Sequence, residues 1–117
     1  MEPSGNEFLR GTLKTIVLKL LTERGRMYGY EITQSVKERT QGEVVLTFGA
    51  LYPVLHKLQQ EGLLITESVE VDGRLRKYYT LTPKGNETAV QKVSDFERFV
   101  EVMKHLLQPA PALSLGN

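Results

Sequence analysis

The chain has 117 residues, a length that fits one domain or one domain with a long appended helix. Its 15 lysines and arginines nearly balance 14 aspartates and glutamates, for a formal net charge of +1, so affinity for a polyanion must come from local clustering of cations. The absence of cysteine excludes disulfides, zinc–thiolate sites, iron–sulfur clusters and a catalytic thiol, and it fits a cytoplasmic setting.

The N-terminal segment MEPSGNEFLR carries acids and a proline where a signal peptide requires cations and an apolar run. No stretch approaches the ~18 consecutive apolar residues of a membrane span. We therefore expect a soluble cytoplasmic protein that does not contact a membrane.

Two helices are predicted first. From residue 8 to residue 24 apolar residues recur at three-and-four spacing, and Gly25 should end that helix. The segment MYGYEITQSVKERTQG then places Tyr28, Ile32 and Val36 at steps of four, which predicts a second, shorter helix. We expect its tyrosines to pack it on the first helix and on the later strands; stacking on bases or on a flat ligand is the alternative.

A third helix is predicted from LTFGALYP onward, with Thr47 as its N-cap. Pro53 requires that this helix either starts just before it or bends there, because proline loses a hydrogen bond and clashes with the carbonyl of Gly49. Leu51, Leu55 and Leu58 form its apolar side.

After Gly62 the helical spacing of apolar residues gives way to short strand-like runs. LLITESVEV and RLRKYYTL are strand-like runs separated by Asp72-Gly73, a strong signal for a hairpin turn. A long last helix follows, with Thr82 as N-cap and Pro83 at its first position.

The last helix carries an apolar stripe at heptad-like spacing, and its charges cancel, so we expect it to bury a surface rather than bind a polyanion. The stripe consists of Ala89, Val93, Phe96, Val100, Met103 and Leu107. The closing QPAPALSLGN has two prolines and no charge, which indicates a flexible tail with Leu113 and Leu115 as candidates for contact with the body. The predicted organisation is a domain over 8–82, a dimerisation helix over 83–108 and a tail over 109–117.

Three helices followed by a two-stranded hairpin predict a mainly α fold with a small β-hairpin, the winged form of the helix-turn-helix. In such a fold one helix enters the DNA major groove and the hairpin touches a neighbouring groove or the backbone. Arg74 and Arg76 should share one face of the second strand and Lys77 should take the other, so the tip presents charge on two sides to phosphates. The competing interpretation is an ordinary solvated hairpin tip.

The third helix offers the other DNA contacts. The side opposite its leucines carries small groups that allow close approach of the backbone, and Thr47, Tyr52 and Lys57 can bond phosphates or base edges, with His56 at the edge. Tyr52 could instead be a core aromatic with its hydroxyl at the rim. Together with the wing, the predicted DNA-binding residues are Thr47, Gly49, Ala50, Tyr52, Pro53, Lys57, Gly73, Arg74, Arg76 and Lys77.

No metal site, cofactor or catalytic centre is expected. His56 and His105 have no second ligand at useful spacing, and the sequence has no nucleophile elbow, no phosphate-cradling glycine loop and no carboxylates paired on one face. An enzyme is therefore not expected.

The motifs YGYEI (28–32), GALYPVLHKLQQEGLL (49–64) and GRLRKYYTLTPKG (73–85), in this order and spacing, resemble the PadR-like family of winged-helix transcriptional regulators over about residues 9 to 107. The resemblance implies a homodimer that binds a pseudo-palindromic operator, usually as a repressor, with the third helix and the wing on DNA. It also implies that the first and last helices form the dimer interface, for which the candidates are Leu9, Leu13, Val93, Phe96, Val100, Met103 and Leu107.

The short C-terminal region resembles the compact subgroup of that family, in which some members bind flat apolar compounds between the subunits by means of tryptophans. This chain has no tryptophan, so that sandwich is not carried over, and Phe8, Phe96 and Phe99 are the residues that would line an effector pocket. The function expected is a dimeric DNA-binding repressor. The alternative is a winged-helix module that assembles proteins without binding DNA, for which the cluster of wing cations would have little use.

Overall fold

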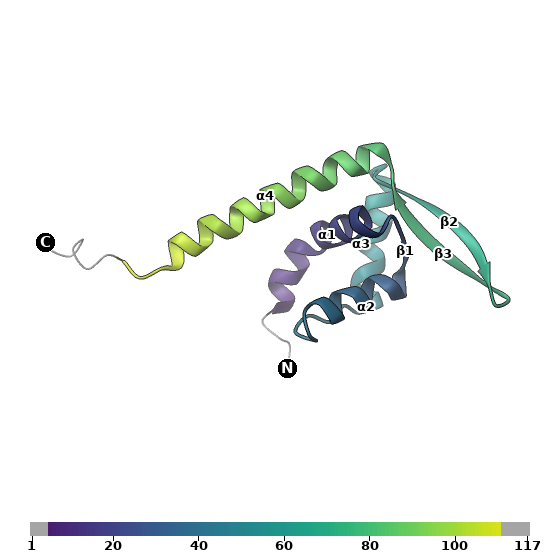
Figure 1. Cartoon of the computed structure of the whole chain (residues 1–117), viewed down its shortest axis with the longest axis horizontal. Helices are drawn as coiled ribbons and strands as arrows, with labels where there is room; N and C mark the ends of the chain where they lie inside the picture. The colour runs from purple at the N-terminus through teal and green to yellow at the C-terminus, as the bar shows by residue number, and fades with distance from the viewer. Residues whose placement is uncertain (1–4, 111–117) are drawn as a thin grey trace, which may run out of the picture.

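A computed structural model describes residues 5–110 and shows four helices and three strands within them (Figure 1). In chain order they are α1 (Gly5–Arg24), β1 (Arg26–Tyr28), α2 (Gly29–Arg39), α3 (Phe48–Gln60), β2 (Leu64–Val71), β3 (Arg74–Leu81) and α4 (Pro83–Leu107). The predicted order of three helices, a hairpin and a last helix is confirmed. The predicted contacts of Leu113 and Leu115 lie outside the described residues.

Both predicted N-caps are confirmed. The Thr47 hydroxyl accepts a hydrogen bond from the backbone N–H of Ala50 at 3.1 Å, and α3 starts at Phe48, directly after Thr47. Pro53 therefore lies well inside α3 rather than near its start. The Thr82 hydroxyl accepts from the backbone N–H of Gly85 at 2.9 Å at the start of α4.

The β2–β3 hairpin, called the wing below, turns at Asp72 and Gly73, whose φ angles are 53° and 79°. Positive φ at both central residues is the type I′ turn that suits a two-residue hairpin, as the Asp-Gly pair predicts. The prediction of a hairpin alone was incomplete, because β1 pairs with the free edge of β3 and makes a three-stranded antiparallel sheet of order β1-β3-β2.

The core lies between α1, α2, α3 and the sheet. The apolar sides of the helices and the buried end of the sheet meet there, and burying such side chains provides the main free energy of folding. The largest fully buried side chains are those of Val17, Leu18, Leu21, Met27, Ile32, Leu51, Leu55, Leu58 and Leu64.

The first turn of α4 is anchored to the link between α3 and β2. The Thr82 hydroxyl donates to the carbonyl of Gly62 at 2.7 Å, and the Thr82 N–H donates to the carbonyl of Leu63 at 3.0 Å. From this anchor α4 runs along α1 and then projects beyond the domain, on the side away from the wing (Figure 1). Among the described helices, none is long and apolar enough to cross a membrane.

Candidate nucleic-acid interface

The side of α3 opposite its buried leucines is exposed over its whole length. All of the DNA-binding residues predicted for this helix and its N-cap are exposed: Thr47, Gly49, Ala50, Tyr52, Pro53 and Lys57. Gly49 and Ala50 present almost no side chain, so another molecule can come close to the backbone of the first turn. The helix thus separates an apolar side that packs on the core from a small and polar side that faces solvent.

Tyr52 lies between the exposed side of α3 and the start of α2. The residue is 44% exposed, and its ring lies 5.7 Å from the ring of Phe48, measured between centroids. The phenol end lies against the Cα of Gly29, where an added Cβ would be 3.0 Å from Tyr52 Cζ. The tip of Tyr52 therefore fixes α3 against the start of α2, while its ring edge stays on the exposed face.

A hollow of about 490 Å³ separates α3 from the wing, and we call it the wing hollow. Its lining residues are Tyr52, Pro53, His56, Lys77 and Tyr79. Lys77 of the wing thus faces the exposed side of α3, so two parts of the predicted interface meet. His56 is absent from the predicted set, although it follows Tyr52 by four residues and so shares its side of the helix.

The alternation predicted along β3 is confirmed by the strand register. Arg74 pairs with Val71 and Arg76 with Val69, on the face of the sheet opposite to Lys77, which pairs with Ser68. The face that carries the arginines is called the outer face below. The wing therefore presents cations on both of its sides.

The cations of the wing differ in their partners. The Arg76 guanidinium lies 4.1 Å from the centroid of the Tyr28 ring, and the nearby Tyr78 side chain raises the pKa of Arg76 above its ordinary value. Arg74, Lys77 and Lys57 form no ion pair within the described part of the chain, where the ion pairs join other residues. Their charges are available to an anionic partner.

The predicted interface residues of α4 lie on a helix that is covered only in its first half. Val93 and Met103 are partly buried, whereas Phe96, Val100 and Leu107 are exposed, Leu107 at 79%. On α1, Leu9 is partly buried. Leu13 is only 3% exposed and packs in the core of its own domain, where it offers a partner almost no surface, so its place in the interface stays a prediction.

The three phenylalanines predicted for an effector pocket lie together. Phe8, Phe96 and Phe99 line a groove of about 510 Å³ between the N-terminal part of α1 and the outer half of α4, and we call it the α1–α4 groove. Val100, Met103 and Leu107 line the same groove. The predicted effector pocket and the predicted interface of α4 are therefore one apolar surface.

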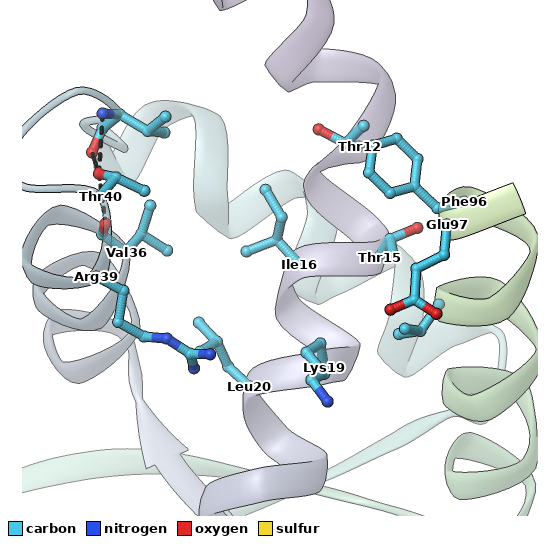
Figure 2. A pocket seen from close by; sticks show the side chains of 12 residues that line it. Thr12, Thr15, Ile16, Lys19, Leu20, Val36, Arg39, Thr40, Phe96 and Glu97 are labelled. Carbon is cyan, nitrogen blue, oxygen red and sulfur yellow. Dashed lines mark hydrogen bonds between the residues drawn. The ribbon is translucent and has the colours of Figure 1, made fainter. Parts of the chain in front are cut away.

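A second apolar groove lies on the neighbouring side of α1, and we call it the α1–α2 groove (Figure 2). It measures about 390 Å³, and Ile16 and Leu20 of α1 face Val36 of α2 across it. Arg39 and Lys19 at its rim are both paired with Glu23, and the Arg39 hydrogen bond lowers the pKa of that carboxyl. Phe96 lines both grooves, which makes the apolar surface around α1 continuous.

No group of three or more histidines and carboxylates that could hold a metal ion occurs between residues 5 and 110. The described surface offers apolar grooves and exposed cations rather than a cluster of acid–base groups.

Comparison with known proteins gives a consistent result. Residues 17–91 match the Transcriptional regulator PadR-like family. A transcriptional regulator of Mycobacterium tuberculosis is 35% identical over 79 residues, which cover 68% of this chain and 70% of that protein.

Solved structures agree with the sequence match. A transcriptional regulator from Clostridium thermocellum superposes with a TM-score of 0.79 at 30% identity, covering 87% of this chain and 99% of that one. A PadR-family regulator from Eggerthella lenta gives a TM-score of 0.75 at 28% identity and 87% coverage of both chains. The chain therefore belongs to the PadR-like family of transcriptional regulators.

Proposed function

We propose that this regulator is a homodimeric repressor that binds a pseudo-palindromic operator in double-stranded DNA, with α3 in the major groove and the wing on the flanking backbone. The observation that carries the proposal is the juxtaposition of the exposed side of α3 with Lys77 across the wing hollow. Gly49 and Ala50 let the backbone approach base edges, while Lys57, Lys77 and Arg74 carry the unpaired charges that phosphates require.

The dimer follows from the apolar surface around α1. Phe99 is 56% exposed and Phe8 is 70% exposed, and both line the groove that the outer half of α4 shares with α1. An apolar surface of this kind that continues over two grooves marks an interaction site. A second copy related by a two-fold axis would cover it with the same surface, because a two-fold interface pairs like with like.

Repression would follow from occupancy of the operator. A dimer would set two copies of α3 at a fixed separation, so we expect a pseudo-palindrome with half-sites about one DNA turn apart, ~34 Å. An apolar effector bound in the α1–α4 groove would lie between the subunits. It would release the operator by changing the separation of the two α3 helices.

The proposal is tested by footprinting on a labelled fragment that spans the promoter of the regulator's own gene, with random-sequence DNA of equal length as competitor. We expect two protected half-sites and at least ~10³-fold preference over the competitor. A selection from a random DNA pool gives the operator independently of where it lies. A pool that enriches no motif, together with an unprotected promoter, would leave the protein-assembly module as the better interpretation.

A further inference from the structure

The outer face of the sheet carries a continuous row of stacked cations and tyrosines, called the outer-face row. The Arg26 guanidinium lies 4.2 Å from the centroid of the Tyr78 ring and pairs with Glu67 at 3.1 Å. The Tyr78 ring meets the Tyr28 ring edge to face at 5.4 Å, and Arg76 stacks on Tyr28. At the end of the row nearest the tip of the wing, the cation of Arg76 lies on the face of the Tyr28 ring.

Tyr28 connects this row to the helices that hold α3. It is the last residue of β1 and the N-cap of α2, and its backbone N–H donates to the carboxylate of Glu31 at 3.1 Å. The phenol end of Tyr52 in α3 packs against the next residue, Gly29. A side chain that is held by Tyr28 is therefore held relative to both α2 and α3.

Arg76 lies where the wing loses its third strand. β1 pairs with β3 only as far as Tyr78, so beyond it the wing is a two-stranded ribbon. A two-stranded ribbon alone is marginally ordered in water. Counted toward the tip of the wing, Arg76 is the first outer-face residue of β3 beyond that pairing. Its contact with Tyr28 therefore fixes the two-stranded part of the wing to a residue that is held by the helices.

We propose that Arg76 is a positioning residue, which braces the wing on Tyr28 and thereby holds Arg74 and Lys77 at the distance from α3 that the operator backbone requires. The proposal rests on the proposed function for its effect on DNA binding, but the brace itself exists in the free protein. A planar guanidinium stacks on an aromatic ring and an ammonium does so less well, so Arg76→Lys should weaken the brace while it keeps the charge.

The first test uses the free protein. NMR relaxation is measured at residues 70–77 in the wild type, Tyr28→Phe, Tyr28→Leu and Arg76→Lys, together with the ring-current shift of the Arg76 side-chain protons. Tyr28→Phe keeps the aromatic face, so wing order and the upfield shift should match the wild type. Tyr28→Leu and Arg76→Lys should lower the order parameters of the wing. Wing order that is unchanged in both variants overturns the proposal.

The second test measures affinity for the selected operator. The brace predicts that Arg76→Lys binds about 3- to 10-fold more weakly, close to Arg76→Ala, and that adding Tyr28→Leu to Arg76→Ala causes little further loss. The matched control is Arg98→Lys, the same substitution at an exposed position of α4 outside the wing, which should bind like the wild type. If Arg76→Lys binds like the wild type and Arg76→Ala lowers the salt slope by ~0.9, Arg76 contacts a phosphate directly and the proposal is wrong.

The two tests separate the brace from the proposed function. A wild-type protein that enriches no operator contradicts the repressor, while the relaxation measurements still decide on the brace. Arg76→Lys changes a partly buried strand residue outside the core, so the proposal is testable even if Tyr28→Leu fails to fold.

Discussion

The phenol end of Tyr52 in α3 lies against the Cα of Gly29, the first residue of α2. This contact sets the separation of the two helices of the helix-turn-helix, because any side chain at residue 29 would overlap the tyrosine. We predict that Gly29→Ala destabilises the fold by about 1–3 kcal/mol, the usual cost of overpacking, and lowers operator affinity further by moving α3. Urea unfolding and DNA titration measure the two effects.

Gly11→Ala is the matched control, because an added Cβ there meets no atom within 4 Å. In a helix interior that change should be neutral or stabilise by up to ~1 kcal/mol. Adding Tyr52→Phe to Gly29→Ala removes the atom that clashes most closely and should recover part of the stability. A double variant as unstable as the sum of the two single variants would show that the contact does not govern the helix separation.

Gly85 has a different role, at the anchor of α4. A Cβ at this position would overlap the backbone carbonyl of Leu63, which already accepts the N–H of Thr82. A backbone atom cannot rotate away, so Gly85→Ala should detach the first turn of α4 from the α3–β2 link. We expect a loss of at least ~2 kcal/mol in unfolding free energy and weaker dimerisation. Unchanged stability would mean that α4 tilts freely about its anchor.

Elements that are determined by neighbouring residues can be predicted from the sequence, whereas elements that depend on residues far along the chain cannot. The two threonine caps and the Asp-Gly turn rest on neighbouring residues, and each was predicted at the correct position. Strand β1 was missed, since Arg26–Tyr28 is too short to show a period and its partners on β3 lie far along the chain. In the sequence the only local indication of β1 is an apolar residue, Met27, between Gly25 and Gly29. Met27 is buried in the structure.

The same division applies to the candidate site. The period of two along β3 predicts that Arg76 and Lys77 point to opposite faces, and the register confirms this. That Arg76 stacks on Tyr28 depends on the pairing of β1 with β3, which no local pattern reveals. The burial of Leu13 in the core was not readable either, because a helical period shows which side is apolar but not whether the domain or a partner covers it.

Glu23 gives a prediction for pH. The hydrogen bond from Arg39, followed by the one from Lys19, lowers the pKa of this carboxyl below its ordinary value. The folded pKa is then below the unfolded one, so the pair stabilises the fold above the unfolded pKa and ceases to do so as pH falls through the folded value. The difference in melting temperature between wild type and Glu23→Gln should be small, because the pair is exposed. It should be constant near neutrality and should disappear as pH falls through the folded pKa of Glu23.

A wild-type melting temperature that equals that of Glu23→Gln at neutral pH would show that the pair contributes nothing. Glu87→Gln, which changes an exposed carboxylate of α4 without an ion pair in the described residues, controls for the change in net charge.

The outer half of α4 should govern the oligomeric state. Val100 and Met103 line the α1–α4 groove, and burying apolar side chains of this size stabilises by ~1.5–3 kcal/mol each. Val100→Asp with Met103→Asp should give a folded monomer that no longer binds the operator with high affinity. Sedimentation and circular dichroism check the two parts, and Lys92→Asp on the same helix is the control for added charge. A wild type that sediments as a monomer at micromolar concentration contradicts the dimer.

The wing and α3 should differ in what they contribute to DNA binding. If Arg74 and Lys77 neutralise phosphates, each Ala substitution should lower the slope of log K against log salt by ~0.9 and weaken operator and random DNA alike. In the proposed complex Ala50 would face the bases, so a larger side chain there should change the preferred sequence at a cost of ~1–3 kcal/mol per lost contact and leave the salt slope unchanged. Titrations at several salt concentrations, on operator and random DNA, compare the two sets of variants. A double variant of Arg74 and Lys77 that keeps the affinity and salt slope of the wild type would mean that these cations are merely solvated. The repressor would then lack the phosphate contacts that its non-specific affinity for DNA requires.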